Sequence, residues 1–224
     1  MNSTTFTTRF ISMKYRLLLI IILVIACGRG KKYHDKKEHI SERSLTAQEI
    51  IDFQADLNTT FKNPKTSPLP DRYRKDFEGL NFFDVDTTYV VKARFERTPD
   101  AVPFLLATTT DEKTEEVLYG IAHFELNGKE HQLEIYQTPS LLSQEKYKDY
   151  LFLPFLDETN GLETYGGGRY IDLTIPKEDT ILIDFNKAYN PYCVYNKKYS
   201  CPLVPRQNYL RTRIEAGVKD FIKD

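Results

Sequence analysis

The stretch that decides the fold is residues 117–136, VLYGIAHFELNGKEHQLEIY. Its two halves alternate apolar and polar residues, the pattern of half-buried strands. Between them lies Asn127-Gly128, the pair most typical of a two-residue type I′ hairpin turn. Such a turn fixes the register of the hairpin, so that Phe124 faces His131. The residues then expected to share the buried face are Leu118, Ala122, Phe124, Leu126, Leu133 and Ile135.

The same register bears on metal binding. Because His131 pairs with Phe124, His123 must lie on the opposite face of the sheet. The two histidines cannot share one zinc ion, so the sequence predicts no metal site and argues against a zinc hydrolase. No motif indicates a cofactor.

Further strands are expected on both sides of the hairpin. Residues 89–96 alternate in polarity, and short apolar runs follow at 102–107, 147–156, 170–175 and 181–185. Before them, a capping box at Thr46–Glu49 and an apolar stripe predict a helix over residues 46–61. A similar stripe predicts a closing helix from Asn208 onward. The fold class expected is therefore α+β: mainly antiparallel β, a barrel-like sheet with one N-terminal and one C-terminal helix.

The chain has 224 residues, enough for one sizeable domain, and a formal net charge of −1. Phosphate binding needs a clustered basic surface, so this balance argues against nucleic acid as a partner.

The N-terminal segment predicts where the protein is located in the cell. Basic residues precede the apolar run Leu17–Ala26, which is too short to span a bilayer but has the length of a signal-peptide core. Cys27 directly follows Ala26, which resembles the lipobox of bacterial lipoproteins, where the cysteine is acylated. The alternative is a plain signal peptide with an incidental cysteine. We interpret residues 1–26 as a lipoprotein signal peptide, 27–43 as a flexible tether and 44–224 as one globular domain.

Special residues are densest between residues 157 and 202. Gly166, Gly167 and Gly168 stand between Tyr165 and Arg169. Glycines can turn several N–H groups toward an anion, and the arginine could add a bidentate fork for carboxylate or phosphate. The alternative is a strand bend that needs glycine for its geometry alone.

The same stretch carries five carboxylates: Asp157, Glu158, Glu163, Asp172 and Asp184. Two carboxylates can form the acid/base pair of glycoside cleavage, and Asp157, Glu163 and Asp184 are the catalytic candidates. Capping, or pairing with Arg169, would explain these carboxylates without catalysis.

Cys193 and Cys201 lie in a loop rich in tyrosine and asparagine. Export would place them in an oxidising compartment, where a disulfide is the default. Buried free thiols and a nucleophilic thiol are the alternatives.

The strings YLFLPFLDETNG, TYGGGRY, DFNKAYNPYC and YSCPLVPRQN resemble a bacterial family known only as domain of unknown function 1684. The resemblance spans roughly residues 53–218. It implies an uncharacterised exported protein, often a lipoprotein, and supplies no reaction and no catalytic residues.

The sequence thus favours an envelope lipoprotein, anchored to membrane through Cys27 on the periplasmic face of the outer membrane. We expect it to bind a small polar or anionic ligand, such as a sugar. The expected ligand-binding residues are Tyr165, Gly166, Gly167, Gly168, Arg169, Asn186, Asn190 and Tyr195. The alternatives are an envelope hydrolase that uses paired carboxylates and a protein-docking module.

Overall fold

The structure is a computed structural model that describes residues 34–221, with side chains from residue 46. The chain divides into two compact units, Met1–Glu42 and Arg43–Asp224. The expected signal peptide and Cys27, the residue expected to be acylated, lie outside the described residues. The strands and all of the described side chains belong to the second unit. Among the described residues, no helix is long and apolar enough to cross a membrane.

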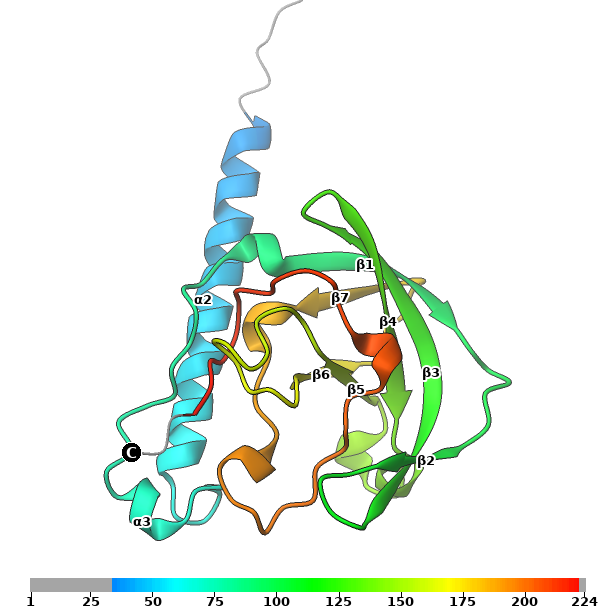
Figure 1. Cartoon of the computed structure of the whole chain (residues 1–224). Coiled ribbons are helices and arrows are strands. Elements are labelled where there is room, and N and C mark those ends of the chain that lie inside the picture. Colours follow the sequence, from blue (N-terminus) through cyan, green and yellow to red (C-terminus); the bar gives the residue numbers. More distant parts are fainter. Residues whose placement is uncertain (1–33, 222–224) are drawn as a thin grey trace, which may run out of the picture. The chain divides into compact units, whose positions relative to one another are not determined.

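A curled, seven-stranded antiparallel sheet forms this second unit (Figure 1). Its strands lie in the order β6-β5-β4-β3-β1-β7, and β2 pairs with β3 beside this path. The bounds are β1 Val90–Arg97, β2 Phe104–Ala107, β3 Lys113–Leu126, β4 Lys129–Gln137, β5 Tyr150–Phe155, β6 Arg169–Thr174 and β7 Thr180–Asp184. Each corresponds to a strand expected from the sequence, and the α+β, barrel-like class is confirmed.

The hairpin of β3 and β4 has the predicted turn and register. Asn127 and Gly128 both have positive φ, 54° and 72°, as a type I′ turn requires. Phe124 pairs with His131, and the expected face is buried except at one position. A register shift between Leu118 and Gly120 moves Leu118 off that face, and it packs in a separate aromatic cluster instead.

The two faces of the sheet bury different residues. The concave side holds the main core, to which β5 contributes Leu151, Leu153 and Phe155. On the other face, Phe152 packs with Tyr136 and Tyr170. β5 is therefore covered on both sides, which explains its unbroken apolar sequence.

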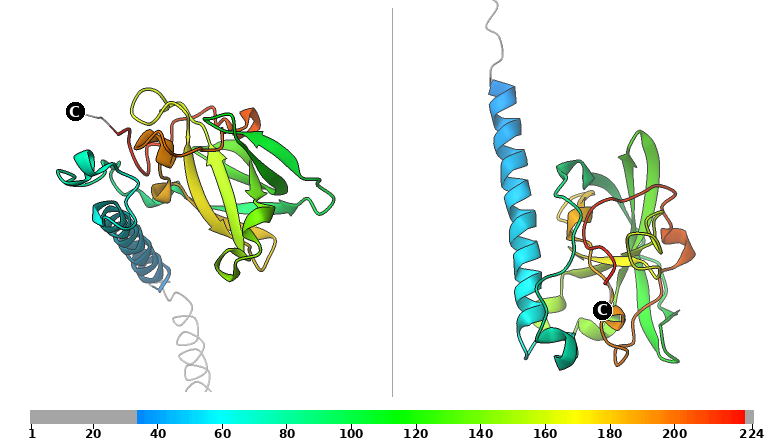
Figure 2. Two further views of the ribbon diagram at one scale, coloured as in Figure 1. Left: turned by 90° about the horizontal axis from the view of Figure 1, so that it is seen from below. Right: turned by 60° about the vertical axis from the view of Figure 1, so that its left-hand side comes forward.

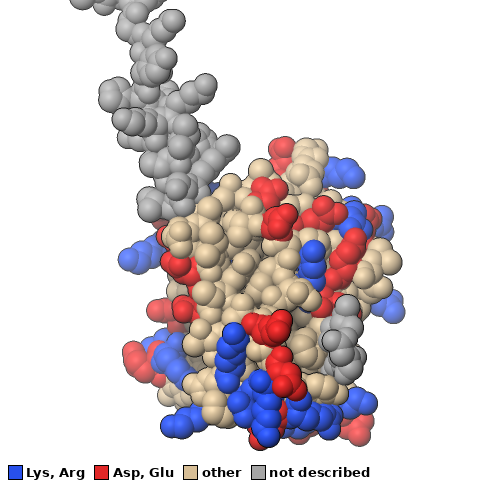
Figure 3. Space-filling view, turned by 90° about the vertical axis from the view of Figure 1, so that its left-hand side faces the viewer, with Lys and Arg blue, Asp and Glu red and all other residues tan. Residues whose placement is uncertain are grey.

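Helix α2, His34–Lys62, begins well before the predicted start. The expected capping box at Thr46–Glu49 lies inside the helix, and the helix includes residues 34–43 of the segment expected to be a tether. Phe61 of α2 packs edge-on against Tyr195, with ring centroids 4.7 Å apart. On the side of the molecule shown in Figure 3, Lys and Arg gather most densely at the lower end, and acidic side chains also lie across the upper part.

The remaining helical elements are single turns. They are α3 Asp71–Arg74, η1 Thr87–Tyr89, η2 Pro139–Leu141, η3 Glu145–Tyr147, η4 Phe185–Lys187, η5 Tyr192–Val194 and η6 Arg206–Asn208. Several of them stand in the loops that surround the sheet (Figure 2).

The predicted closing helix is wrong. From Asn208 the chain is irregular and extended, and it runs across the curled sheet (red in Figure 1). Leu210, Ile214 and Ala216 are buried in the main core, so the apolar residues are internal although the segment is not helical. Gly217 has φ +77°, and a Cβ there would lie 2.7 Å from the Phe185 carbonyl oxygen. This backbone conformation interrupts a helix at that point.

Candidate functional site

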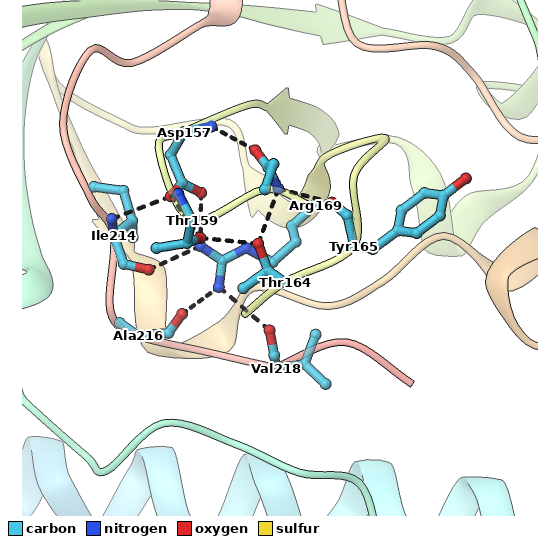
Figure 4. A network of polar contacts seen from close by, with 9 residues as sticks. Asp157, Thr159, Thr164, Tyr165, Arg169, Ile214, Ala216 and Val218 are labelled. Carbon is cyan, nitrogen blue, oxygen red and sulfur yellow. Dashed lines mark hydrogen bonds and ion pairs between the residues drawn. The ribbon is translucent and has the colours of Figure 1, made fainter. Parts of the chain in front are cut away.

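The geometry of Arg169 departs from the ligand-binding role expected of it. Its side chain is 0% exposed. One terminal nitrogen, Nη2, lies 2.8 Å from Asp157 Oδ2 and 2.9 Å from the Ile214 carbonyl oxygen. The other, Nη1, donates to the carbonyl oxygens of Ala216 at 2.5 Å and Val218 at 3.3 Å (Figure 4). Burial lowers the pKa of Arg169, and the charge of Asp157 opposes that effect. The arginine holds the C-terminal segment through these contacts, and it does not line the cavity described below.

The Asp157 carboxylate also has hydrogen-bond partners within the protein. Its Oδ1 accepts hydrogen bonds from the Thr159 hydroxyl at 2.6 Å and from the backbone N–H groups of Thr159 and Ile214. The Thr159 hydroxyl in turn lies 2.8 Å from that of Thr164 (Figure 4). The carboxylate closes a buried polar network, which accounts for its burial without catalysis.

Gly166, Gly167 and Gly168 differ in how much space a side chain would have. Gly168 has φ +93°, and a Cβ there would lie 2.6 Å from the Phe155 carbonyl oxygen. A Cβ on Gly167 would meet the Tyr165 ring at 2.5 Å, whereas one on Gly166 would have no atom closer than 3.7 Å. Gly168 is required by backbone geometry, and this position fits the strand-bend interpretation of the turn.

The other catalytic candidates, Glu163 and Asp184, have partners of their own. Glu163 Oε1 pairs with Arg213 at 2.5 Å. Asp184 Oδ1 accepts from the backbone N–H and the side-chain amide of Asn186. Asn186 also exchanges hydrogen bonds with the backbone of Asp86, so it joins the end of β7 to the chain before β1.

Of the remaining expected ligand-binding residues, only Asn190 lines the main cavity of the unit, which lies beside the aromatic cluster of the sheet. Its amide also donates to the Lys219 carbonyl at 3.0 Å. Tyr195 is buried against Phe61 and Phe221. Tyr165 packs against the same cluster as Tyr195.

The predicted disulfide is absent, and Cys193 and Cys201 carry free thiols. The two are in contact, since the backbone N–H of Cys193 lies 3.1 Å from Cys201 Sγ. A hydrogen bond from Cys201 lowers the pKa of the Cys193 thiol to about 6. Cys201 is buried and lines the main cavity, and Cys193 is half-buried.

The main cavity, of about 590 Å³, lies on the face of the sheet opposite the main core. Its walls come from helix α2, strands β3, β5 and β6, the turn at Thr138, Ser140 and Leu141, and the loop between residues 187 and 202, and it is open on one side. Its walls are largely aromatic. The rings that line it belong to Phe53, Phe61, Tyr150, Phe152, Tyr170, Tyr189, Tyr192 and Tyr199.

Two carboxylates line the cavity. Glu116 on β3 is 1% exposed, and its Oε2 accepts a hydrogen bond of 2.8 Å from the Thr138 hydroxyl. Burial raises the pKa of Glu116. Asp172 on β6 is exposed, and its Oδ1 accepts from the hydroxyls of Tyr150 at 2.9 Å and Tyr189 at 2.6 Å.

The charges of Glu116 and Asp172 both affect the pKa of Tyr150. Burial and then the negative charges of Asp172 and Glu116 raise the pKa of Tyr150. The sole cationic residue among the described cavity walls is Lys187, whose Nζ lies 3.8 Å from Asp184. Asp184 and Lys187 also border a smaller hollow of about 390 Å³ beyond Asp172. The arrangement is a mostly apolar pocket with a few convergent polar groups, the usual form of a small-molecule site.

Sequence reasoning missed Glu116, although a signal was present. Residues 116 and 118 point to one face of β3, so a glutamate there occupies a position where burial is expected. Asp172 was noted only as one carboxylate among several. The ring of tyrosines could not be assembled from the sequence, because its members come from separate elements.

These features define a curled antiparallel fold with an aromatic pocket on its outer face. The chain belongs to the family described as protein of unknown function DUF1684, whose model matches residues 75–219. It is also similar to an uncharacterized protein of Haloarcula marismortui solved by solution NMR. The identity is 30% and the TM-score 0.61, and the match covers 83% of this chain and 97% of that one. The chain matches no curated protein.

Proposed function

We propose that this protein is a binding protein that holds a small polar organic ligand in the aromatic cavity. The observation that carries the proposal is the cavity itself. Its volume of about 590 Å³ lies within the range of small-molecule sites, and apolar walls with few polar groups are their usual lining. Tyrosine faces and carboxylates together suit a ligand with an apolar face and hydrogen-bonding groups, as a sugar has.

The location of the binding differs from the one expected. The Gly166–Arg169 turn and Asp157 support the fold, and the loop rich in tyrosine and asparagine contributes Asn190, Tyr192 and Tyr199 to the cavity. We favour binding over the hydrolase alternative, because each carboxylate considered for catalysis has a partner within the protein. A pocket with convergent polar groups also favours ligand binding over protein docking.

The proposal includes an envelope location, with a lipid on Cys27 as the membrane anchor. Its support is the sequence alone: a basic start, a short apolar run and a cysteine after Ala26.

A matched pair of serine substitutions tests the binding site. Ser140 lines the cavity, and Ser143 does not, yet both are exposed. Full-length wild-type protein and the S140W and S143W variants are purified from the envelope of the native host. Small molecules released on denaturation are then compared by mass spectrometry. We expect one compound to accompany the wild type and S143W and to be depleted in S140W, because the indole fills the cavity. The same compounds in equal amounts from all three proteins would contradict the proposal.

A further inference from the structure

The cavity holds two carboxyl groups, Glu116 and Asp172, that have no cationic partner among the described residues. Glu116 is 1% exposed, and no ion pair among the described residues includes Glu116 or Asp172. Burial of a carboxylate without a counter-charge is costly unless a partner is supplied or the group takes up a proton. The ammonium group of Lys187 pairs with Asp184, and so it does not supply that partner.

Neutral hydroxyls surround these carboxylates. Thr138 donates to Glu116, and Tyr150 and Tyr189 donate to the same oxygen of Asp172. Hydroxyl donors orient a carboxylate but leave its charge in place. Oδ2 of Asp172 takes part in no hydrogen bond between described residues, and this oxygen is available to a ligand.

The rings around the cavity complement the same kind of ligand. The face of an aromatic ring is electronegative and attracts cations, most strongly where water is excluded. Phe152 and Tyr170 lie edge-on to each other with centroids 4.8 Å apart, and Tyr170 meets Tyr189 at 6.0 Å and a near-perpendicular angle. Mutually perpendicular rings present faces to a cavity from more than one direction, as in sites that bind ammonium groups.

We infer that the ligand of this cavity is an organic cation, whose ammonium group lies between Glu116 and Asp172 and against the tyrosine rings. This inference rests on the proposed function and narrows its ligand class from polar molecules to amines. A ligand of this class supplies the positive charge that the two carboxylates lack. An anionic ligand would bring a further negative charge next to them.

Matched probes separate charge from shape. Binding to the purified full chain is measured by calorimetry for choline and for its uncharged carbon analogue, 3,3-dimethyl-1-butanol. A second pair, n-hexylamine and n-hexanol, covers primary amines. We expect the cation of at least one pair to bind about tenfold or more tightly than its neutral partner.

Substitutions in the cavity test whether the preference for the cation over its neutral analogue arises there. Glu116→Gln and Asp172→Asn keep the shapes of the side chains and remove their charges, and each is expected to lower cation affinity about tenfold. The neutral analogue should bind these variants and the wild type equally. Glu115→Gln, at the exposed neighbouring position on β3, and Asp179→Asn, in the exposed turn before β7, are the controls and should change neither affinity.

The possible results separate the inference that the ligand is a cation from the proposed function of binding a small molecule. If charged and neutral probes bind the cavity equally, the cation inference is overturned and small-molecule binding stands. If a monosaccharide panel binds in an S140W-sensitive manner and the amines do not bind, the inference is again overturned and the proposed function is retained. If no probe binds and no compound accompanies the wild type from the envelope, both fail. Charge-dependent binding that is lost in Glu116→Gln supports both.

Discussion

Glu116 occupies a position on β3 where the strand pattern calls for an apolar side chain. It is 1% exposed, and burial raises the pKa of its carboxyl group. Ionisation of this group therefore opposes folding when the cavity is empty. Side chains that are unfavourable for stability are common where a protein binds or reacts, because the same group meets a ligand that compensates it.

Glu116→Gln is expected to stabilise the ligand-free protein at neutral pH. The folded pKa of the carboxyl lies above the unfolded value, so the native state binds the proton more tightly. Below the pKa of the unfolded state, Glu116 is protonated in both the folded and the unfolded protein. Its ionisation then takes nothing from the free energy of unfolding. As pH rises through the folded pKa, the wild type loses stability that the glutamine variant keeps. Thermal unfolding at about pH 4 and pH 7 measures this, with Glu115→Gln as the control. An equal gain at both pH values would indicate a packing effect instead.

Cys193 is expected to react as a thiolate at unusually low pH. The hydrogen bond from Cys201 lowers its pKa to about 6, against an ordinary value of 9.0, and thiolates are the reactive form. Alkylation of Cys193 by iodoacetamide, followed by peptide mass spectrometry, should show a midpoint well below the ordinary value. Full-length protein with Cys27→Ser avoids interference from the third cysteine. In Cys201→Ala the midpoint should rise; an unchanged midpoint would show that Cys201 does not set it.

Among the elements, the turn before β6 shows how adjacent glycines can differ. Gly168→Ala is expected to destabilise the protein by more than about 2 kcal/mol, since a left-handed backbone and a clash act together. Its Cβ would lie 2.6 Å from both the Phe155 carbonyl oxygen and Val204. Gly166→Ala, with no atom closer than 3.7 Å, should change stability little. Urea unfolding of both variants measures the difference, and equal losses would contradict the geometric argument.

The strands were predictable because their signals are local. The Asn127-Gly128 turn sets one register, and alternation of polarity marks the other strands. The C-terminal segment was not predictable on that basis. Leu210, Ile214 and Val218 recur at helical spacing, yet Ile214, Ala216 and Val218 also recur at every second position. The carbonyl oxygens of these three residues meet Arg169, so a contact distant in sequence selects the extended form.

Arg169→Met tests that selection. The substitution leaves Asp157 buried without its cation, and losing one member of a buried pair costs about 3–5 kcal/mol. It also removes the donors to the C-terminal carbonyl groups. Chemical denaturation should show this loss, and hydrogen exchange should show lost protection at the N–H of Val218, which donates to Ala188. The double variant Arg169→Met, Asp157→Leu should be less destabilised than the single one. If it is more destabilised, the ion pair is not the source of the effect.

In the second unit as a whole, the main core and the cavity use opposite faces of one sheet. The residues that hold the fold together, Arg169 and Asp157 among them, were the ones that looked most like a site in the sequence. Buried charge and glycine are informative about both kinds of role, and only the partners decide between them. Asn190 was expected at a site and lines the cavity, whereas Glu116 and Tyr150 were not expected there. One glutamate and scattered tyrosines are ordinary in sequence and become unusual when brought together.

In the proposed envelope location, a lipid on Cys27 holds the molecule at the membrane. If Cys27 carries the lipid, Cys27→Ser should move the protein from the detergent phase to the aqueous phase in Triton X-114 partitioning. It should also abolish incorporation of a palmitate analogue, because the variant lacks the cysteine that would carry the acyl chains. More than one acyl chain on Cys27 would account for stable anchoring. Cys193→Ser is the matched control and should still partition with detergent and take up label. Unlabelled wild-type protein that is released as a soluble form would favour the plain signal peptide. The cavity proposal would be unaffected, since it is argued from wall residues that the structure describes, from Phe53 to Pro202.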